Sequence, residues 1–174
     1  MKIAVCGSNK ELDKEITKKA FEIGKELAKR EVLLLTGSGK GYPYKAAKGA
    51  FSNNGKVFGV SPAKDEEEHI NMYNFPTDAF TKIEFTNLGI PGRNLPLVKE
   101  ANAIIIISGQ IGSLNEFTIA FHDSKVIGIL ENSGQITDII EEIAKICDKN
   151  GEKENIIYSS DPKELVSLVL NKLK

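Results

Sequence analysis

The stretch "AIIIISGQIGSLNEF" (residues 103–117) determines how the rest of the chain is interpreted. Its five consecutive apolar residues predict a strand that is buried on both faces. The Ser and Gly residues that follow predict a turn, and a helix is predicted over residues 113–123. A strand, a glycine turn and a helix form the repeating unit of parallel α/β folds. The stretch also raises two questions: what the turn binds, and whether Glu116 has a chemical or a structural role.

The same alternation extends along the whole chain. Apolar runs predict further strands at residues 3–6, 32–35, 57–60, 82–85, 126–130 and 156–158. Helices are predicted between the strands. The first contains Leu12 and Ile16, with a capping box of Ser8 and Glu11, and others are predicted at 42–52, 95–101 and 136–147. The last helix is predicted to begin at Pro162, with Asp161 as its N-cap. We therefore predict a single Rossmann-like domain over residues 1–174, of the α/β class, with a doubly wound, mainly parallel sheet and helices on both faces.

Composition and charge exclude several classes of protein. The chain has 23 basic and 24 acidic residues, so no basic excess points to nucleic acid or to an anionic membrane. No apolar run is long enough to span a bilayer, and the N-terminus becomes polar too early for a signal peptide. The two cysteines, Cys6 and Cys147, lack the spacing of a metal site and fit a reducing compartment. We expect a cytoplasmic protein with no metal site, no nucleic acid partner and no membrane partner.

Three predicted strands run into glycine-containing turns at the same edge of the sheet. The first turn contains Gly7 and Ser8, the second Gly37, Ser38, Gly39 and Gly41, and the third Gly109, Gln110, Gly112 and Ser113. Glycine lets a ligand approach the backbone, and the free N–H groups of a helix N-terminus attract anions. Ligands of doubly wound folds bind at this edge, where the strand order reverses. The turns therefore predict a site for a phosphate-bearing small molecule.

The known dinucleotide and triphosphate motifs do not match. The fingerprint G-x-G-x-x-G fails because Tyr42 stands where its third glycine would fall, and "GSGKG" lacks the full pattern G-x-x-x-x-G-K-[ST]. A mononucleotide or another compact phosphate therefore fits better than a typical NAD or ATP site.

Two charged residues are candidates for chemistry. Only two of the 23 basic residues are arginines: Arg30 at the end of a predicted helix, and Arg93 in the predicted loop "LGIPGRNLP". A guanidinium in such a loop suits phosphate or carboxylate. Glu116 completes the pattern S-x-x-E with Ser113, which is typical of a capping box, but it could equally act as a carboxylate beside a bound sugar phosphate. The sequence leaves both interpretations open.

These motifs resemble the SLOG superfamily, which includes the LONELY GUY phosphoribohydrolases and the molybdenum cofactor carrier proteins. Residues 108–116 resemble the LONELY GUY signature P-G-G-x-G-T-x-x-E, and Arg93 lies 23 residues before Glu116, as the family arginine does. Ser108 and Gln110 depart from P-G-G, and Asn94 replaces a lysine. The segments "GRN", "GYP" and "IGSLNEFTIA" look closest to the carrier-like branch.

The resemblance implies a Rossmann-like protein that binds a nucleotide-like phosphate ligand or a molybdenum cofactor-like ligand, with no cofactor required. The alternative is a phosphoribohydrolase that cleaves nucleoside 5′-monophosphates, in which Arg93 and Glu116 would be catalytic; whether the protein is an enzyme stays open. Family members imply a homodimer or a larger homo-oligomer. A purely structural interaction protein is a third possibility, although it would not need three anion-ready turns.

The longest irregular stretch is predicted at residues 61–79 and contains the acidic run "KDEEEH". Consecutive carboxylates could bind a hard cation, but such runs are more often solvated. The stretch could instead form a lid over the crevice.

Overall fold

The computed structural model describes residues 1–174, and its strands lie close to the predicted apolar runs. Seven strands form one sheet in the order β4-β3-β2-β1-β5-β6-β7, and every neighbouring pair is parallel. The strands are β1 (Lys2–Gly7), β2 (Leu33–Thr36), β3 (Val57–Ser61), β4 (Lys82–Phe85), β5 (Ala103–Ile107), β6 (Val126–Leu130) and β7 (Ile156–Ser159). The predicted α/β class with a parallel, doubly wound sheet is confirmed.

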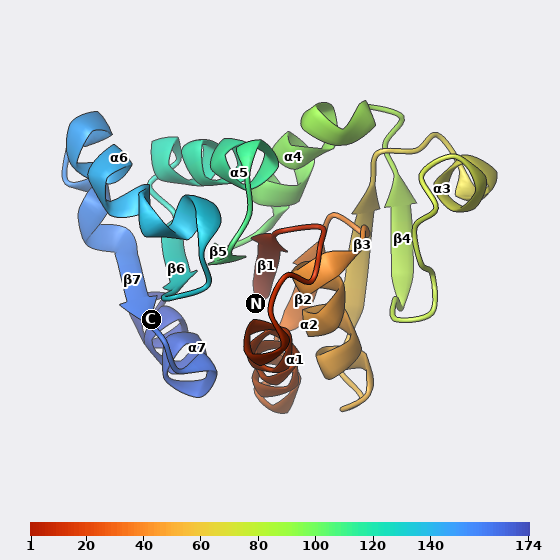
Figure 1. Cartoon of the computed structure of the whole chain (residues 1–174), viewed down its shortest axis with the longest axis horizontal. Coiled ribbons are helices and arrows are strands. Elements are labelled where there is room, and N and C mark those ends of the chain that lie inside the picture. The colour runs from red at the N-terminus through yellow and green to blue at the C-terminus, as the bar shows by residue number, and fades with distance from the viewer.

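Helices cover both faces of the sheet (Figure 1). One layer contains α1 (Lys14–Lys29), α2 (Gly41–Phe51) and α7 (Pro162–Lys172). The opposite layer contains α4 (Gly89–Glu100), α5 (Ile111–His122) and α6 (Ile140–Cys147). The short helix α3 (Glu66–Asn71) lies beside β4, and two 3₁₀ turns occupy Gln135–Asp138 and Glu152–Asn155. No helix is both long enough and apolar enough to cross a membrane.

The central strands supply apolar side chains to both layers. In β1, Ile3 and Val5 pack with α1 and α2, whereas Ala4 and Cys6 pack with α4 and α5. Strand β5 is buried at all five positions, because side chains alternate across a sheet that is covered on both faces. The uninterrupted apolar run in the sequence follows from this double burial.

The strand order reverses between β1 and β5. Successive strands are added on one side of β1 as far as β4 and on the other side from β5 to β7. Gly7 at the end of β1 lies opposite Ile107 at the end of β5. The turns that leave β1, β2 and β5 therefore emerge together at the switch point, where ligands of such folds bind.

The first helix begins later than predicted. Its N-cap is Asp13, whose carboxylate accepts hydrogen bonds from the backbone N–H groups of Glu15 and Ile16 at 2.7 and 3.0 Å. The predicted capping box of Ser8 and Glu11 is wrong, since residues 8–13 precede the helix. The buried Tyr42 hydroxyl accepts hydrogen bonds from the N–H groups of residues 12 and 13, and this tertiary contact holds the longer connection.

Helix α4 begins at Gly89, so Arg93 belongs to a helix and the predicted loop is wrong. Pro91 lies in the first turn, where a missing N–H removes no intrahelical hydrogen bond. Pro96 lies inside the helix, so the shorter helix predicted to begin at residue 95 is also wrong. As a result, Arg93 is positioned by helical backbone.

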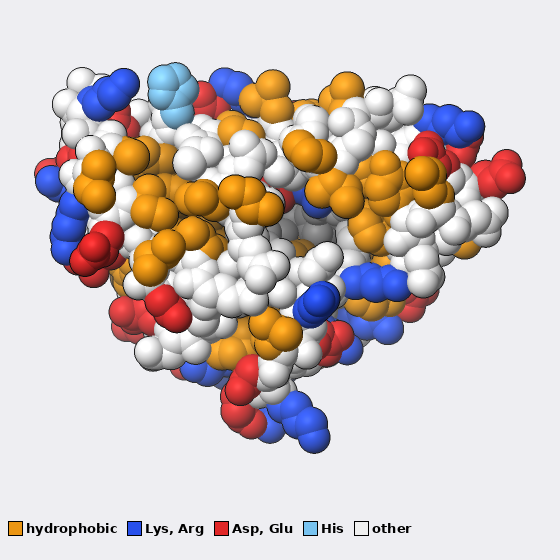
Figure 2. All heavy atoms as spheres, turned by 45° about the horizontal axis from the view of Figure 1, so that its top comes forward, with side chains coloured by type: hydrophobic (Ala, Val, Ile, Leu, Met, Phe, Trp, Pro, Cys, Tyr) orange, Lys and Arg blue, Asp and Glu red, His pale blue; other side chains and the backbone are white.

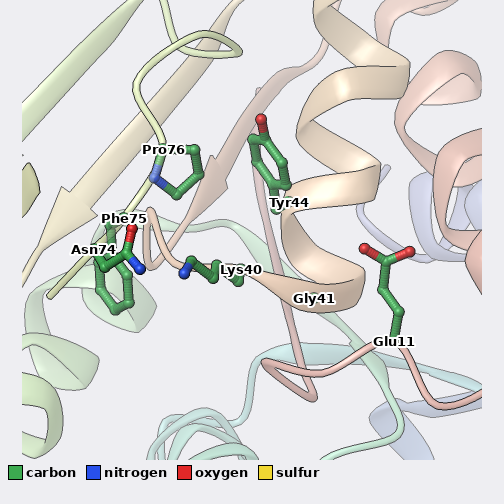
Figure 3. A pocket seen from close by; sticks show the side chains of 7 residues that line it. All are labelled: Glu11, Lys40, Gly41, Tyr44, Asn74, Phe75 and Pro76. Atoms are coloured by element: carbon green, nitrogen blue, oxygen red, sulfur yellow. The ribbon is translucent and has the colours of Figure 1, made fainter.

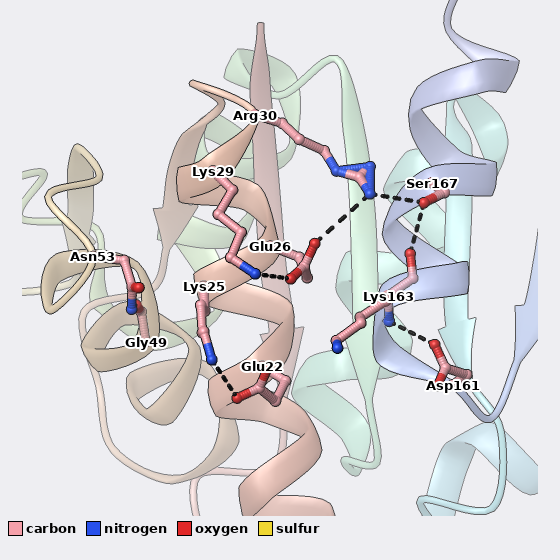
Figure 4. Close-up of polar contacts among 10 residues, drawn as sticks. All are labelled: Glu22, Lys25, Glu26, Lys29, Arg30, Gly49, Asn53, Asp161, Lys163 and Ser167. Carbon is pink, nitrogen blue, oxygen red and sulfur yellow. Dashed lines mark hydrogen bonds and ion pairs between the residues drawn. The ribbon is translucent and has the colours of Figure 1, made fainter.

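A polar seam joins α1 to α7 (Figure 4). Arg30 caps the C-terminus of α1, as expected, donates to Ser167 Oγ at 2.9 Å and lies 3.7 Å from the Glu26 carboxylate. Asp161 caps α7 in front of Pro162, which confirms the predicted N-terminus.

Candidate functional site

A cavity of about 510 Å³ lies at the switch point, between the turn after β1 and helices α4 and α5. It is lined by Gly7, Ser8, Asn9, Ile90, Pro91, Arg93, Asn94, Gln110, Ile111, Gly112, Ser113, Asn115 and Glu116. Figure 2 shows a hollow on this face of the molecule. Eight residues predicted as ligand-binding or catalytic therefore lie around one cavity.

The cavity contains a buried ion pair. Arg93 Nη1 on α4 lies 2.9 Å from Glu116 Oε1 on α5. The same nitrogen donates to Asn94 Oδ1 at 2.9 Å, and Asn94 Nδ2 donates to Asn115 Oδ1 at 2.8 Å. The side chains of α4 and α5 are thus fixed relative to each other across the site.

Glu116 is not a capping residue. Helix α5 begins at Ile111 with Gln110 as its N-cap, so Ser113 is already inside the helix and Glu116 lies a further turn along. The capping-box interpretation is therefore wrong. The pattern S-x-x-E occurs here because one face of the helix carries polar residues into the cavity.

The surroundings of Glu116 act on the pKa of its carboxyl in opposite directions, and burial has the larger effect. Burial raises the pKa of this carboxyl above its ordinary value of 4.5, while the Arg93 guanidinium and the Cys6 thiol lower it to a smaller extent. Burial also raises the pKa of Cys6, and the Glu116 charge raises it further. We therefore expect Cys6 to remain a thiol, which disfavours a nucleophilic role for it.

The N-terminus of α5 keeps free donors. The backbone N–H groups of Ile111, Gly112 and Ser113 have no acceptor in the protein, and no side chain caps this end. A Cβ atom at Gly112 would meet nothing within 4 Å, so the backbone there is open to the cavity. These donors, together with the helix dipole, favour an anion.

The turn before α5 is anchored by the segment that follows β6. Gln135 Oε1 accepts hydrogen bonds from the Gly109 N–H and the Ser108 hydroxyl, both at 3.0 Å, and Ser133 Oγ accepts the Ser108 N–H at 2.8 Å. Gly109 has a φ of 112°, which favours glycine, and does not line the cavity. Its predicted contact with phosphate is therefore replaced by a structural hydrogen bond to Gln135.

A smaller cavity of about 80 Å³ continues behind the ion pair and is lined in part by Cys6, Thr36, Gly37, Gly39 and Phe75. A Cβ atom at Gly37 would lie 2.2 Å from Arg93 Cζ, so only glycine lets the guanidinium reach this position. Thr36 Oγ1 and Arg93 Nε are buried without a hydrogen-bond partner. Such atoms mark a place where a polar ligand group can bind.

A third pocket of about 290 Å³ follows, lined by Glu11, Lys40, Gly41, Tyr44, Asn74, Phe75 and Pro76 (Figure 3). Asn74, Phe75 and Pro76 belong to the stretch predicted as irregular (residues 61–79) and form part of the wall of this pocket. Asp65 caps α3, and the buried His69 contacts Ser61 Oγ at 2.9 Å and the Pro76 carbonyl at 3.2 Å. These contacts give His69 a structural role.

The structure thus distributes the predicted site residues among three connected pockets, with two exceptions. Ser38 is fully buried against Gly59 and lines none of these pockets, and Gly109 lies beneath the Ser113 side chain. The sequence prediction missed Cys6, Lys40, Phe75 and Gln135. Among these four residues, only Gln135 had a signal in the sequence: it ends the turn "ENSGQ" (residues 131–135), which follows the predicted strand 126–130.

Comparisons with known proteins identify relatives of the whole fold. An uncharacterized protein of Archaeoglobus fulgidus is 29% identical over 132 residues, which cover 75% of this chain and 80% of that protein. The molybdenum cofactor binding protein of Rippkaea orientalis has a TM-score of 0.82 at 23% identity, with 99% of this chain and 97% of that chain covered. The molybdenum cofactor carrier protein of Chlamydomonas reinhardtii has a TM-score of 0.81 at 22% identity, with coverages of 99% and 98%.

These two structures share the fold with this chain. The model of the SLOG cluster4 family matches residues 1–166, nearly the whole chain. The resemblance of the glycine turns to the SLOG superfamily is therefore confirmed, and the chain belongs to the SLOG cluster4 family.

Proposed function

We propose that this protein binds a nucleotide-like ligand through its phosphate and holds it without cleaving it. The observation that supports this most strongly is the open N-terminus of α5. Three backbone donors at Ile111, Gly112 and Ser113 face a cavity of about 510 Å³ that is large enough for a mononucleotide. The phosphate would accept hydrogen bonds from these donors and from the Ser113 hydroxyl.

The rest of the ligand would extend toward the ion pair. Arg93 Nε and Thr36 Oγ1 lack partners in the protein, so they can bind oxygen atoms of a sugar or of a heterocyclic ring. Ile90 and Phe75 line the adjacent pocket and supply apolar surface for a ring. This combination of anion donors, unpartnered polar atoms and apolar walls fits a phosphorylated heterocycle better than a simple anion.

Binding of the ligand without cleavage is favoured because the Glu116 carboxylate is already paired with Arg93. This carboxylate is paired with Arg93 at 2.9 Å and buried, so it lacks the exposure with which a carboxylate would orient water. The structural relatives named for binding or carrying the molybdenum cofactor support the same interpretation. A molybdenum cofactor-like cargo is therefore proposed beside a nucleotide as the ligand of this cavity.

Gly112→Leu tests the proposed phosphate contact. The new side chain meets no protein atom at its Cβ, so the fold should survive while the side chain occupies the cavity. Isothermal titration calorimetry with AMP and GMP should show wild-type binding that the variant weakens by about a hundredfold or more, since several charge-assisted hydrogen bonds are blocked. Thr118→Leu adds the same side chain to an exposed position of α5 and should leave the affinity unchanged. Equal affinity in both variants would exclude the α5 site.

A phosphoribohydrolase is the second candidate, because Arg93 and Glu116 lie in the same cavity as the α5 donors. It predicts release of ribose 5-phosphate from a panel of nucleoside 5′-monophosphates by the wild type, and none by Glu116→Gln. Binding without release by the folded wild type would favour the carrier. Release of ribose 5-phosphate that depends on Glu116 would instead show that the protein is a phosphoribohydrolase.

A further inference from the structure

The cleft continues beyond the ion pair to a differently charged end. The main cavity and the small inner cavity share Gly7, Asn9, Ile90, Arg93 and Glu116. The inner cavity and the outer pocket share Lys40 and Phe75. One elongated cleft thus runs from the N-terminus of α5, past Arg93 and Glu116, to the N-terminus of α2.

The charges along this cleft are unevenly distributed. In the main cavity the only charged side chains are Arg93 and Glu116, which neutralise each other. At the far end Glu11 pairs with Lys45 at 3.4 Å, and Tyr44 donates to Asp78. Lys40 has no acidic partner or hydrogen bond in the protein, and Figure 3 shows its side chain pointing toward Asn74 and away from Glu11. Lys40 is therefore an uncompensated cation at the far end.

The N-terminus of α2 beside Lys40 keeps one free backbone donor, the Gly41 N–H, because the Tyr42 N–H donates to the Ser8 carbonyl at 3.0 Å and Pro43 has no N–H. Lys40 is the N-cap of α2, no side chain caps this helix, and its first turn contains no acidic residue. The second observation is independent of the helix end. Thr36 is 1% exposed, lines the connecting cavity, and its hydroxyl has no partner. A polar ligand that passes Arg93 toward Lys40 would satisfy this hydroxyl.

We propose that the pocket between Lys40 and Phe75 is a second anion subsite, which binds a further negatively charged group of the ligand held at α5. The inference rests on the proposed function and narrows the ligand to molecules with two separated anionic groups. Phe75 would pack against the part between them. Glu11 also lines this pocket but is paired with Lys45 at 3.4 Å, so the Lys40 charge remains available to the anion.

Binding of three probes tests the proposal. AMP has one phosphate, whereas adenosine 3′,5′-bisphosphate and the 5′-phosphorylated diadenylate pApA each have two, the second being a monoester in the bisphosphate and a diester in pApA. At least one of the two-phosphate probes should bind about tenfold more tightly than AMP, because the second phosphate gains a charge-assisted hydrogen bond. Lys40→Met, which keeps an unbranched apolar stem, should remove this gain and affect AMP much less. The affinities should also fall more steeply with salt for the two-phosphate probes.

Lys56→Met is the matched control, since Lys56 is an exposed lysine before β3 and the change alters the net charge equally. It should retain the preference for two phosphates. If AMP binds through Gly112 but neither two-phosphate probe binds more tightly, the second subsite is wrong and the proposed function stands. The same conclusion follows if Lys40→Met and Lys56→Met are indistinguishable. If no probe binds, both proposals are overturned.

Discussion

Glu26 on α1 and Glu116 on α5 are covered to nearly the same degree, 6% and 5% exposed, and each pairs with basic residues. Their pKa values nevertheless shift in opposite directions. The hydrogen bond from Lys29 lowers the pKa of Glu26, with help from Arg30 and Lys163, whereas burial raises the pKa of Glu116 despite Arg93. Glu26 lies beneath half-exposed side chains at the α1–α7 seam (Figure 4), whereas Glu116 lies in the interior with one cation.

The helix N-termini of the α1–α7 seam also differ from those of the cleft. In the two helices of the seam, Asp13 and Asp161 accept the free N–H groups at the N-termini of α1 and α7. At the cleft, α2 and α5 have no side-chain cap and no acidic residue in the first turn. One region satisfies its polar groups internally, and the other leaves donors and unpaired atoms available. This contrast, more than any single motif, supports the cleft as the proposed ligand-binding site.

Removing one arginine from each region should give the largest difference. Arg93→Ala leaves the buried Glu116 without its cation and should lower the free energy of unfolding by about 3–5 kcal/mol. Arg30→Ala should cost at most about 1 kcal/mol, because Arg30 lies 3.7 Å from Glu26, which retains Lys29. Urea unfolding followed by far-UV circular dichroism measures both, as the chain has no tryptophan.

A double variant separates loss of the ion pair from loss of packing. If Arg93→Ala lowers the free energy of unfolding because it leaves the Glu116 carboxylate buried without a cation, adding Glu116→Gln should recover much of the lost stability. Equal losses for the two arginines, or no recovery in the double variant, would mean that the cleft pair is no different from the surface pairs of the seam.

The helix caps should give an intermediate difference. Asp161→Ala removes the acceptor of two N–H groups and should cost about 1 kcal/mol of stability without changing the affinity for AMP. Gln110→Ala removes no capping hydrogen bond, so its effect on stability should be within about 0.5 kcal/mol. Thermal unfolding and calorimetric titration of both variants check this. A large stability loss for Gln110→Ala would mean that this end of α5 has a structural role that its hydrogen bonds do not reveal.

The sequence predicts the fold better than it predicts the site, for a physical reason. Continuous apolar runs such as Ala103–Ile107 arise from burial on both faces, and this local pattern also identified β4 and β6 within their observed bounds. The turns at their ends were recognisable because glycine is needed there. The predicted layers of helices follow from the same alternation.

The site depends on contacts between distant segments. The pattern at Ser113 and Glu116 predicts a cap when it is considered alone, but Arg93 on another helix determines the role of Glu116. Likewise, Gly and Pro around Arg93 suggest a loop, although Gly89 and Pro91 lie in the first turn of α4, where they are compatible with a helix. The resemblance to a family brought Arg93 and Glu116 together, but nothing local indicated that Lys40 and Phe75 would border the same cleft.

The smallest expected difference between the seam and the cleft is in the pH dependence of stability, which compares Glu26 and Glu116 directly. Because the folded-state pKa of Glu26 is below its ordinary value of 4.5, ionised Glu26 stabilises the fold above pH 4.5, and this contribution is lost as the pH falls through the lowered value. For Glu116 the raised pKa reverses the sign: its contribution is complete below pH 4.5 and is lost as the pH rises through the raised value.

Urea unfolding of wild type, Glu26→Gln and Glu116→Gln between pH 3 and 8 would show this reversal. The stability of wild type relative to Glu26→Gln should fall toward acid, whereas its stability relative to Glu116→Gln should fall as the pH rises above 4.5. A tenfold difference in the acid dissociation constant between the folded and the unfolded chain corresponds to about 1.4 kcal/mol of stability. Parallel profiles would mean that Arg93 stabilises the Glu116 charge as fully as the seam stabilises Glu26. The cleft carboxylate would then be as permanently ionised as a structural one, and a ligand would meet a fixed ion pair instead of a carboxyl group that can take up a proton.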